Sequence, residues 1–147
     1  MKPTHIIVHC SDTKDSGTVS WGAIKRWHVG RLGWSDIGYH FGCELIGDEF
    51  EILAGRPINK MGSHCKAGGM NHVALGFCLV GKFEDESPPE DQWEKSARYV
   101  AGLCYVLGIP VANIRGHREY DDHKTCPGSR FDMDKFRSLV DSYMKGG

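Results

Sequence analysis

Apolar residues recur along the chain in patterns that predict four strands. The run at residues 4–10 is apolar enough for a buried strand. Residues 38–46 alternate between apolar and small or polar side chains, and a second alternating run follows at 49–53. Gly47-Asp48 lies between them as a two-residue turn signal, so the two runs predict a β-hairpin. The apolar run at 73–80 predicts a central strand.

The two-residue period of a strand assigns side chains to faces. In the first strand, His9 shares a face with Ile7, and Cys10 points to the opposite face, where we expect it to pack in the core. In the hairpin, the same period predicts that Tyr39 shares a face with Phe41. His9 lies at the carboxyl end of its strand, where α/β proteins tend to bind ligands.

Apolar positions three and four residues apart predict a helix over roughly residues 20–30, for which Thr18 or Ser20 is the candidate cap. The same spacing predicts a last helix that Asp132 caps.

A longer helix is predicted to follow Ser87. Ser87 is the expected cap, Pro88 the first helical residue and Glu90 the partner in a capping box, and Gly108 ends the helix. The order of elements is strand, helix, hairpin, strand, helix, irregular segment and helix. This order predicts an α/β fold, with a sheet that has helices on its faces.

Length and composition fit one soluble domain that spans residues 1–147. The chain is 40% apolar and 25% charged, with a formal net charge of -1 and no long basic run. We therefore expect no nucleic-acid partner and no binding to anionic membranes. The apolar run near the N-terminus is too short for a signal peptide or a membrane span, which predicts a cytoplasmic protein when synthesised, without membrane insertion.

The chain contains six cysteines, at positions 10, 43, 65, 78, 104 and 126. An even number permits a disulfide framework, but without a secretion signal we expect free thiols. Cys78 and Cys104 lie in apolar runs, where a cysteine behaves as a small hydrophobic residue.

Metal-binding side chains gather between Gly116 and Gly128. His117 and Cys126 are ligands that zinc prefers, and His9, almost the whole chain away, is the candidate third ligand. Three protein ligands with an open fourth position are the pattern of a catalytic zinc site, because the metal lowers the pKa of a bound water to about 7. The sequence has no Cys-x-x-Cys pair, which argues against a structural zinc site with four cysteines or with two cysteines and two histidines.

Other interpretations of these residues stay open on sequence grounds. A lone histidine such as His9 is more often a hydrogen-bonded residue at a strand end. His64, His72 or His123 could replace one of the three ligands. Cys126 could instead be a nucleophile with His117 as its base, but the sequence names no third residue to orient them.

Two further residues are candidates for catalysis. The Lys124 ammonium, beside a metal, could stabilise a developing oxyanion, although most lysines are simply solvated. The Tyr39 phenol could hydrogen-bond the substrate carbonyl or the attacking water, although a core tyrosine with a satisfied hydroxyl is the simpler interpretation.

Six short motifs occur together and in order along nearly the whole chain. They are Ile7-Val8-His9-Cys10-Ser11, Gly38-Tyr39-His40-Phe41, Gly62-Ser63-His64, the segment 76–81, Gly116-His117-Arg118-Glu119 and Lys124-Thr125-Cys126-Pro127-Gly128. In this set the chain resembles zinc-dependent N-acetylmuramoyl-L-alanine amidases of the phage-lysozyme (endolysin) type, which are relatives of the peptidoglycan-recognition proteins.

The resemblance implies a central mixed β-sheet flanked by helices, with one Zn²⁺ in a surface groove. It implies hydrolysis of the amide between N-acetylmuramic acid and L-alanine in peptidoglycan, with His9, His117 and Cys126 as zinc ligands and Tyr39 and Lys124 as the catalytic pair. Recognition-only relatives commonly lack the cysteine ligand, so Cys126 favours activity.

The sequence leaves two functions other than the amidase open. One is a peptidoglycan-binding module without catalysis, and the other is a domain in which zinc is needed only for folding. We expect a monomer that acts on the cell wall after the membrane is breached. The loop 62–72 and the turn 34–36 are the expected groove walls.

Overall fold

The structure, a computed structural model, describes residues 1–14 and 20–146. Its centre is a five-stranded sheet in the order β3-β2-β4-β1-β5. The β2–β3 pair is antiparallel, and the β1–β4, β1–β5 and β2–β4 pairs are parallel, so the sheet is mixed, as expected. The strands are β1 (His5–Cys10), β2 (Phe41–Ile46), β3 (Glu49–Ala54), β4 (Ala74–Leu79) and β5 (Ile114–Gly116).

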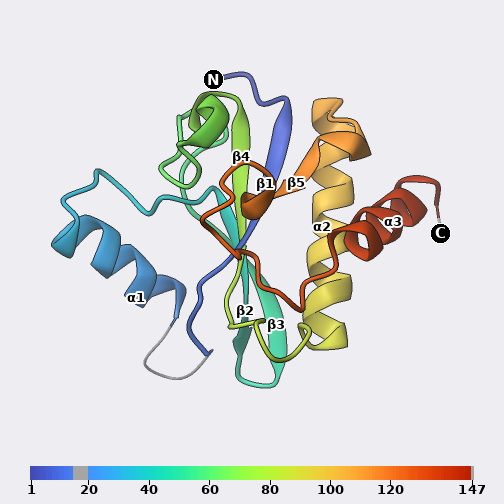
Figure 1. Cartoon of the computed structure of the whole chain (residues 1–147), viewed down its shortest axis with the longest axis horizontal. Coiled ribbons are helices and arrows are strands. Elements are labelled where there is room, and N and C mark those ends of the chain that lie inside the picture. Colours follow the sequence, from blue (N-terminus) through green and yellow to red (C-terminus); the bar gives the residue numbers. More distant parts are fainter. Residues whose placement is uncertain (15–19, 147) are drawn as a thin grey trace.

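Helices cover both faces of the sheet. Figure 1 shows α2 and α3 on one side and α1 on the other. The α-helices are α1 (Trp21–Arg26), α2 (Glu90–Leu107) and α3 (Met133–Met144). A π-helical turn, Trp27–Arg31, continues α1, and three 3₁₀ segments lie at Ala67–His72, Val111–Asn113 and His117–Glu119.

The larger core lies between the sheet and the α2–α3 pair. Alternate residues of the strands point into it, as the two-residue period predicts. Its fully buried members include Ile6, Val8, Leu75, Phe77, Leu79, Val100, Phe136 and Val140. On the opposite face, two smaller clusters form around Ile7 and around Trp21. This second face is the one on which His9 lies, so the site is built on the thinner side of the sheet.

The start of α1 follows the predicted chemistry. The Ser20 hydroxyl accepts a hydrogen bond from the Ala23 amide at 3.2 Å, which is the cap geometry expected for a helix N-terminus. The buried Glu44 carboxylate accepts from the Trp21 amide at 2.8 Å and so attaches this helix to β2. The alternative cap, Thr18, lies outside the described residues. Ser20 therefore serves as the cap.

The predicted start of α2 was wrong. The helix begins at Glu90 after Pro89, and no side chain caps it. Pro88 precedes a proline, and the ring of that proline disfavours the α conformation for Pro88. The Ser87 hydroxyl instead donates to the Arg130 carbonyl at 3.2 Å. The predicted stop at Gly108 is confirmed, with a φ of 68° in the left-handed region.

The strand β5 is absent from the prediction because it has only three residues. The last helix and its Asp132 cap are confirmed: the carboxylate accepts from the Lys135 amide at 3.0 Å. All six cysteines are among the described residues, and all are free thiols. Among the helices of the described part of the chain, none is long and apolar enough to cross a membrane.

Candidate metal centre

Strand register brings His9 and His117 together. β1 and β5 are parallel neighbours, and Val8 pairs with Gly116 in their ladder. The residue that follows each of this pair in the sequence is a histidine, His9 within β1 and His117 directly after β5, and the two rings lie with their centroids 4.7 Å apart. The short strand β5, which the sequence pattern does not reveal, is therefore what delivers His117 to His9.

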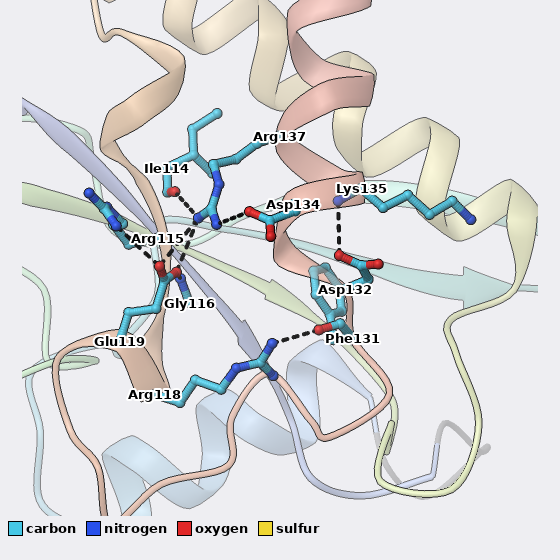
Figure 2. A network of polar contacts seen from close by, with 10 residues as sticks. All are labelled: Ile114, Arg115, Gly116, Arg118, Glu119, Phe131, Asp132, Asp134, Lys135 and Arg137. Carbon is cyan, nitrogen blue, oxygen red and sulfur yellow. Dashed lines mark hydrogen bonds and ion pairs between the residues drawn. The ribbon is translucent and has the colours of Figure 1, made fainter.

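Polar contacts hold the segment that carries Cys126. The Arg118 amide donates to the Cys126 carbonyl at 2.8 Å, and its guanidinium donates to the Gly128 carbonyl at 2.6 Å and the Phe131 carbonyl at 2.7 Å. Figure 2 shows Arg118 reaching Phe131 below a second group of contacts around Glu119. The chain after β5 is thus folded back so that Cys126 returns to the site.

The Glu119 carboxylate fixes the other end of the same segment. It accepts from the Gly116 amide at 2.5 Å and lies 3.2 Å from guanidinium nitrogens of Arg115 and Arg137. Figure 2 shows this group between β5 and α3. Glu119 therefore ties the residue before His117 to the last helix, which supports the position of His117.

Three donor atoms converge at the centre of the site. One ligand atom from each of His9, His117 and Cys126 lies within 4.8 Å of the other two. The Cys126 sulfur is 3.6 Å from Nδ1 of His9. His9 is only 1% exposed, whereas the other two residues are partly buried. The three candidates from the sequence are thus brought together.

The donors lie at a cavity of about 410 Å³. Tyr39, His123 and Lys124 also line it. Of the expected groove walls, Trp34 contributes from the turn, and Ser63 and His64 contribute from the loop. A second cavity of about 420 Å³, mostly apolar, shares Tyr39 and includes Ile24 and Trp27. The two cavities provide room for an extended ligand beside the donor atoms.

Burial keeps the site histidines neutral. Desolvation, followed by the neighbouring His64 and His117, lowers the pKa of His9 well below its ordinary value. Desolvation also lowers the pKa of His117, with Lys124 adding to the effect and Asp121 opposing it. Neutral imidazole is the form that binds a metal, because protonation occupies the lone pair.

The thiol of Cys126 has two contacts with Cys10. The Cys10 amide donates to its sulfur at 3.4 Å, and the Cys10 thiol lies beside it. This thiol contact and burial raise the pKa of Cys126 far above its usual range. A bound cation would reverse that effect, since a coordinated thiol is deprotonated. Cys10 packs in the core, as expected, but it also contacts this candidate ligand.

Tyr39 reaches the site from the face opposite to the predicted one. It packs with Trp21 and Cys78, whereas Phe41 points into the larger core. The reason is that β2 begins only at Phe41, so the strand period does not extend back to Tyr39. Its ring centroid is 5.2 Å from that of His9. Burial raises the pKa of its phenol well above the usual value, so the group stays protonated and can donate a hydrogen bond.

The other histidines occupy different positions. His123 lines the cavity, but its side chain is 93% exposed and it is not one of the three converging residues. His72 is exposed at the end of the 3₁₀ segment Ala67–His72, within the loop 62–72. His64 is buried, and its Nδ1 lies 3.0 Å from Nε2 of His9. It therefore contacts a candidate ligand rather than replacing one.

Glu84 was missed by sequence reasoning. Its carboxylate accepts from the Thr125 hydroxyl at 2.6 Å and from the Ser129 hydroxyl at 2.5 Å, on either side of Cys126. These hydrogen bonds, that from Ser129 first, lower the pKa of Glu84. An acidic residue in a loop carries no periodic signal that would have identified it.

The donor set fits zinc. Two neutral imidazole nitrogens and one thiol sulfur are ligands of borderline softness, and a set of three leaves a fourth tetrahedral position open. His9, His117 and Cys126 line the cavity, so a metal that they held would be accessible from it.

Comparisons with known proteins identify the family of the chain. Residues 1–129 match the Amidase_2 family, described as N-acetylmuramoyl-L-alanine amidase. The chain is 44% identical over 137 residues to the endolysin of Enterobacteria phage T3, with 89% of this chain and 83% of that protein covered.

Solved structures agree as well. The amidase LysC from Clostridium intestinale superposes with a TM-score of 0.79 at 27% identity, over 96% of this chain and 87% of that one. A Drosophila PGRP-LB mutant in complex with tracheal cytotoxin superposes with a TM-score of 0.73 at 29% identity, over 89% and 79% of the two chains. The fold, the matched length and the converging His and Cys residues lead to one conclusion: the chain belongs to the N-acetylmuramoyl-L-alanine amidase family.

Proposed function

We propose that this chain is a zinc-dependent N-acetylmuramoyl-L-alanine amidase that hydrolyses the amide between N-acetylmuramic acid and L-alanine in peptidoglycan. The observation that carries the proposal is the convergence of His9, His117 and Cys126 within 4.8 Å at a cavity. These residues would hold Zn²⁺. When bound, zinc supplies a Lewis acid and an activated water at neutral pH.

Two side chains from this chain would assist the reaction. The exposed Lys124 lines the cavity beside the donors, so its ammonium can approach a substrate carbonyl and stabilise the negative charge that develops on the oxygen. Tyr39 stays protonated and can donate to the substrate or to the attacking water. Loss of such a donor typically lowers the rate by about 10²- to 10³-fold.

The proposed substrate is the muropeptide of the cell wall. A relative was solved in complex with tracheal cytotoxin, a monomeric diaminopimelic acid-type peptidoglycan, which supports a peptidoglycan ligand. The two adjoining cavities offer an extended binding surface in this chain. We further propose that the whole chain acts as one domain and as a monomer, which size-exclusion chromatography with light scattering would test.

The direct test uses purified peptidoglycan and the whole chain. We expect new L-alanine amino termini to appear, to stop when a chelator removes the metal, and to return when zinc is added. Zinc content should fall in Cys126→Ser. Release of reducing sugar ends that is insensitive to the chelator would refute the amidase and indicate a glycosidase. Zinc-independent binding to peptidoglycan without turnover would instead favour the non-catalytic module.

A further inference from the structure

We propose that His64 is a positioning residue that fixes the tautomer of His9, so that His9 presents Nδ1 to the metal. This inference rests on the proposed metal site. It starts from two connected hydrogen bonds on the buried side of the site, which have no part in the proposed reaction. One joins the Ala74 carbonyl to the His64 ring, and the other joins the His64 ring to the His9 ring.

The Ala74 carbonyl determines which ring nitrogen carries the hydrogen in His64 and, through His64, in His9. The Ala74 oxygen lies 3.1 Å from Nε2 of His64, and a carbonyl can only accept, so Nε2 of His64 carries the hydrogen. In a neutral imidazole the other nitrogen is then an acceptor. Nδ1 of His64 lies 3.0 Å from Nε2 of His9, which must therefore donate. The remaining nitrogen of His9, Nδ1, is left with a free lone pair.

That free nitrogen faces the other donors. Nδ1 of His9 is 3.6 Å from the Cys126 sulfur. The opposite tautomer would place a hydrogen on Nδ1, where the metal should bind, and would leave the two facing nitrogens of His9 and His64 without a hydrogen between them. A protonated His64 would also present a donor to His9, and it would be a charge in a side chain that is 8% exposed.

The packing around the His64 ring opposes a flip about the Cβ–Cγ bond, which would place carbon atoms where Nδ1 and Nε2 now lie. A Cβ on Gly76 would lie 2.6 Å from Cγ of His64, and one on Gly62 would lie 2.5 Å from Cδ2, so both glycines leave the slot that the ring fills. The Asn71 side-chain oxygen accepts from the His64 and Cys65 amides at 2.8 Å each, which fixes the backbone. A flipped ring would lose both of its hydrogen bonds.

Nuclear magnetic resonance of the metal-free protein tests the tautomer without any activity measurement. We expect two-bond ¹H–¹⁵N correlations of ¹⁵N-labelled protein at neutral pH to show both His9 and His64 with the hydrogen on Nε2. Single substitutions of each histidine would assign the signals. A His9 ring with its hydrogen on Nδ1, or one that is split evenly between tautomers, would overturn the proposal.

Two variants separate the contacts of His64. In His64→Asn the amide oxygen can occupy the place of Nδ1 and still accept from His9, whereas the bond to Ala74 is lost. In His64→Gln the amide can reach Ala74, whereas the acceptor for His9 is lost. We expect the zinc dissociation constant, measured by competition with a coloured chelator, to rise by about 10- to 100-fold in His64→Gln and to stay close to wild type in His64→Asn.

Gln92→Leu is the matched control for lost stability. Gln92 is buried on α2 and donates to the carbonyls of Cys43 and Val80 at 3.0 Å each, on the far side of the sheet from His9. The Gln92→Leu variant should unfold at a lower urea concentration than the wild type, with unchanged zinc affinity. Equal loss of zinc affinity in both His64 variants, or no loss in either, would refute the role of His64. Failure of the wild type to bind zinc would refute the proposed function instead, and the tautomer measurement would still decide the role of His64.

Discussion

Adding a single methyl group at Gly76 should disturb the candidate metal site, although Gly76 itself does not line the cavity. Gly76 lies within β4 and contributes no side chain to the cavity. An alanine Cβ there would lie 2.6 Å from Cγ and 3.0 Å from Nδ1 of His64. Because His64 also fills the space beside Gly62, its ring has little room to retreat, and Gly76→Ala should displace it from His9.

The size of the effect follows from one stabilising and two destabilising contributions. Alanine is favoured over glycine in a strand by roughly 0.5–1 kcal/mol, which acts to stabilise the variant. Overpacking of a buried site costs about 1–3 kcal/mol. A displaced His64 would leave buried polar groups unsatisfied, at a further cost of about 1–3 kcal/mol. We therefore expect Gly76→Ala to lower the free energy of unfolding by about 1–5 kcal/mol.

Urea unfolding of the metal-free protein, followed by circular dichroism, measures this loss. Gly102→Ala is the matched control: Gly102 lies inside α2 and nothing is within 4 Å of its added Cβ, so the substitution should stabilise the chain by about 1 kcal/mol. In a His64→Ala background the clash with the imidazole is absent, and Gly76→Ala should become stabilising by up to about 1 kcal/mol. A Gly76→Ala variant as stable as wild type, with unchanged zinc affinity, would refute the reasoning.

Three further predictions concern the charge on Lys124, the protonation of His64 and the cap of α3. Lys124→Ala should keep its zinc and its unfolding midpoint but lose about 10²- to 10³-fold in kcat on muropeptides, and an unchanged rate would remove Lys124 from the mechanism. Burial lowers the pKa of His64 to about 3 in the folded chain, against 6.5 when unfolded, so the unfolded state binds more protons between these values. The free energy of unfolding of the metal-free protein should therefore fall as the pH drops below 6.5, and His64 should contribute up to about 1.4 kcal/mol per pH unit to this fall. The urea midpoint should depend less steeply on pH in His64→Asn than in the wild type. Asp132→Ala should cost about 1 kcal/mol of unfolding free energy through the lost bond to the Lys135 amide, without a change in zinc affinity, and an unmoved urea midpoint would contradict the cap.

Much of the fold could be predicted because its elements carry strong local signals. The hairpin, the central strand β4 and the helices showed clear periodicity, and Ser20, Gly108 and Asp132 marked helix ends. The start of α2 was mispredicted because consecutive prolines override an apparent capping box. The strand β5 escaped because three residues are too few to show a period, although its ladder with β1 brings His117 to His9.

The candidate site, like the fold, could be predicted from the sequence only in part. His9, His117 and Cys126 could be proposed because their side-chain chemistry is distinctive, and the resemblance to a family placed them in one set. His64 could be noted only as a spare histidine, because its importance comes from one hydrogen bond across 55 residues of sequence. The position of Tyr39 was mispredicted because the backbone bends at His40, directly before β2, and the alternation pattern does not reveal such a bend.

The position of the three converging residues along the chain has a consequence for how the protein matures. His9 lies in the first strand, whereas Cys126 follows it by 117 residues, beyond every strand of the sheet. During synthesis the first histidine leaves the ribosome long before its partners exist, so a nascent chain has no complete set of donors. Under the proposed function, zinc uptake at this site should therefore be among the last events of folding, and zinc retention would then measure the fraction of correctly completed molecules.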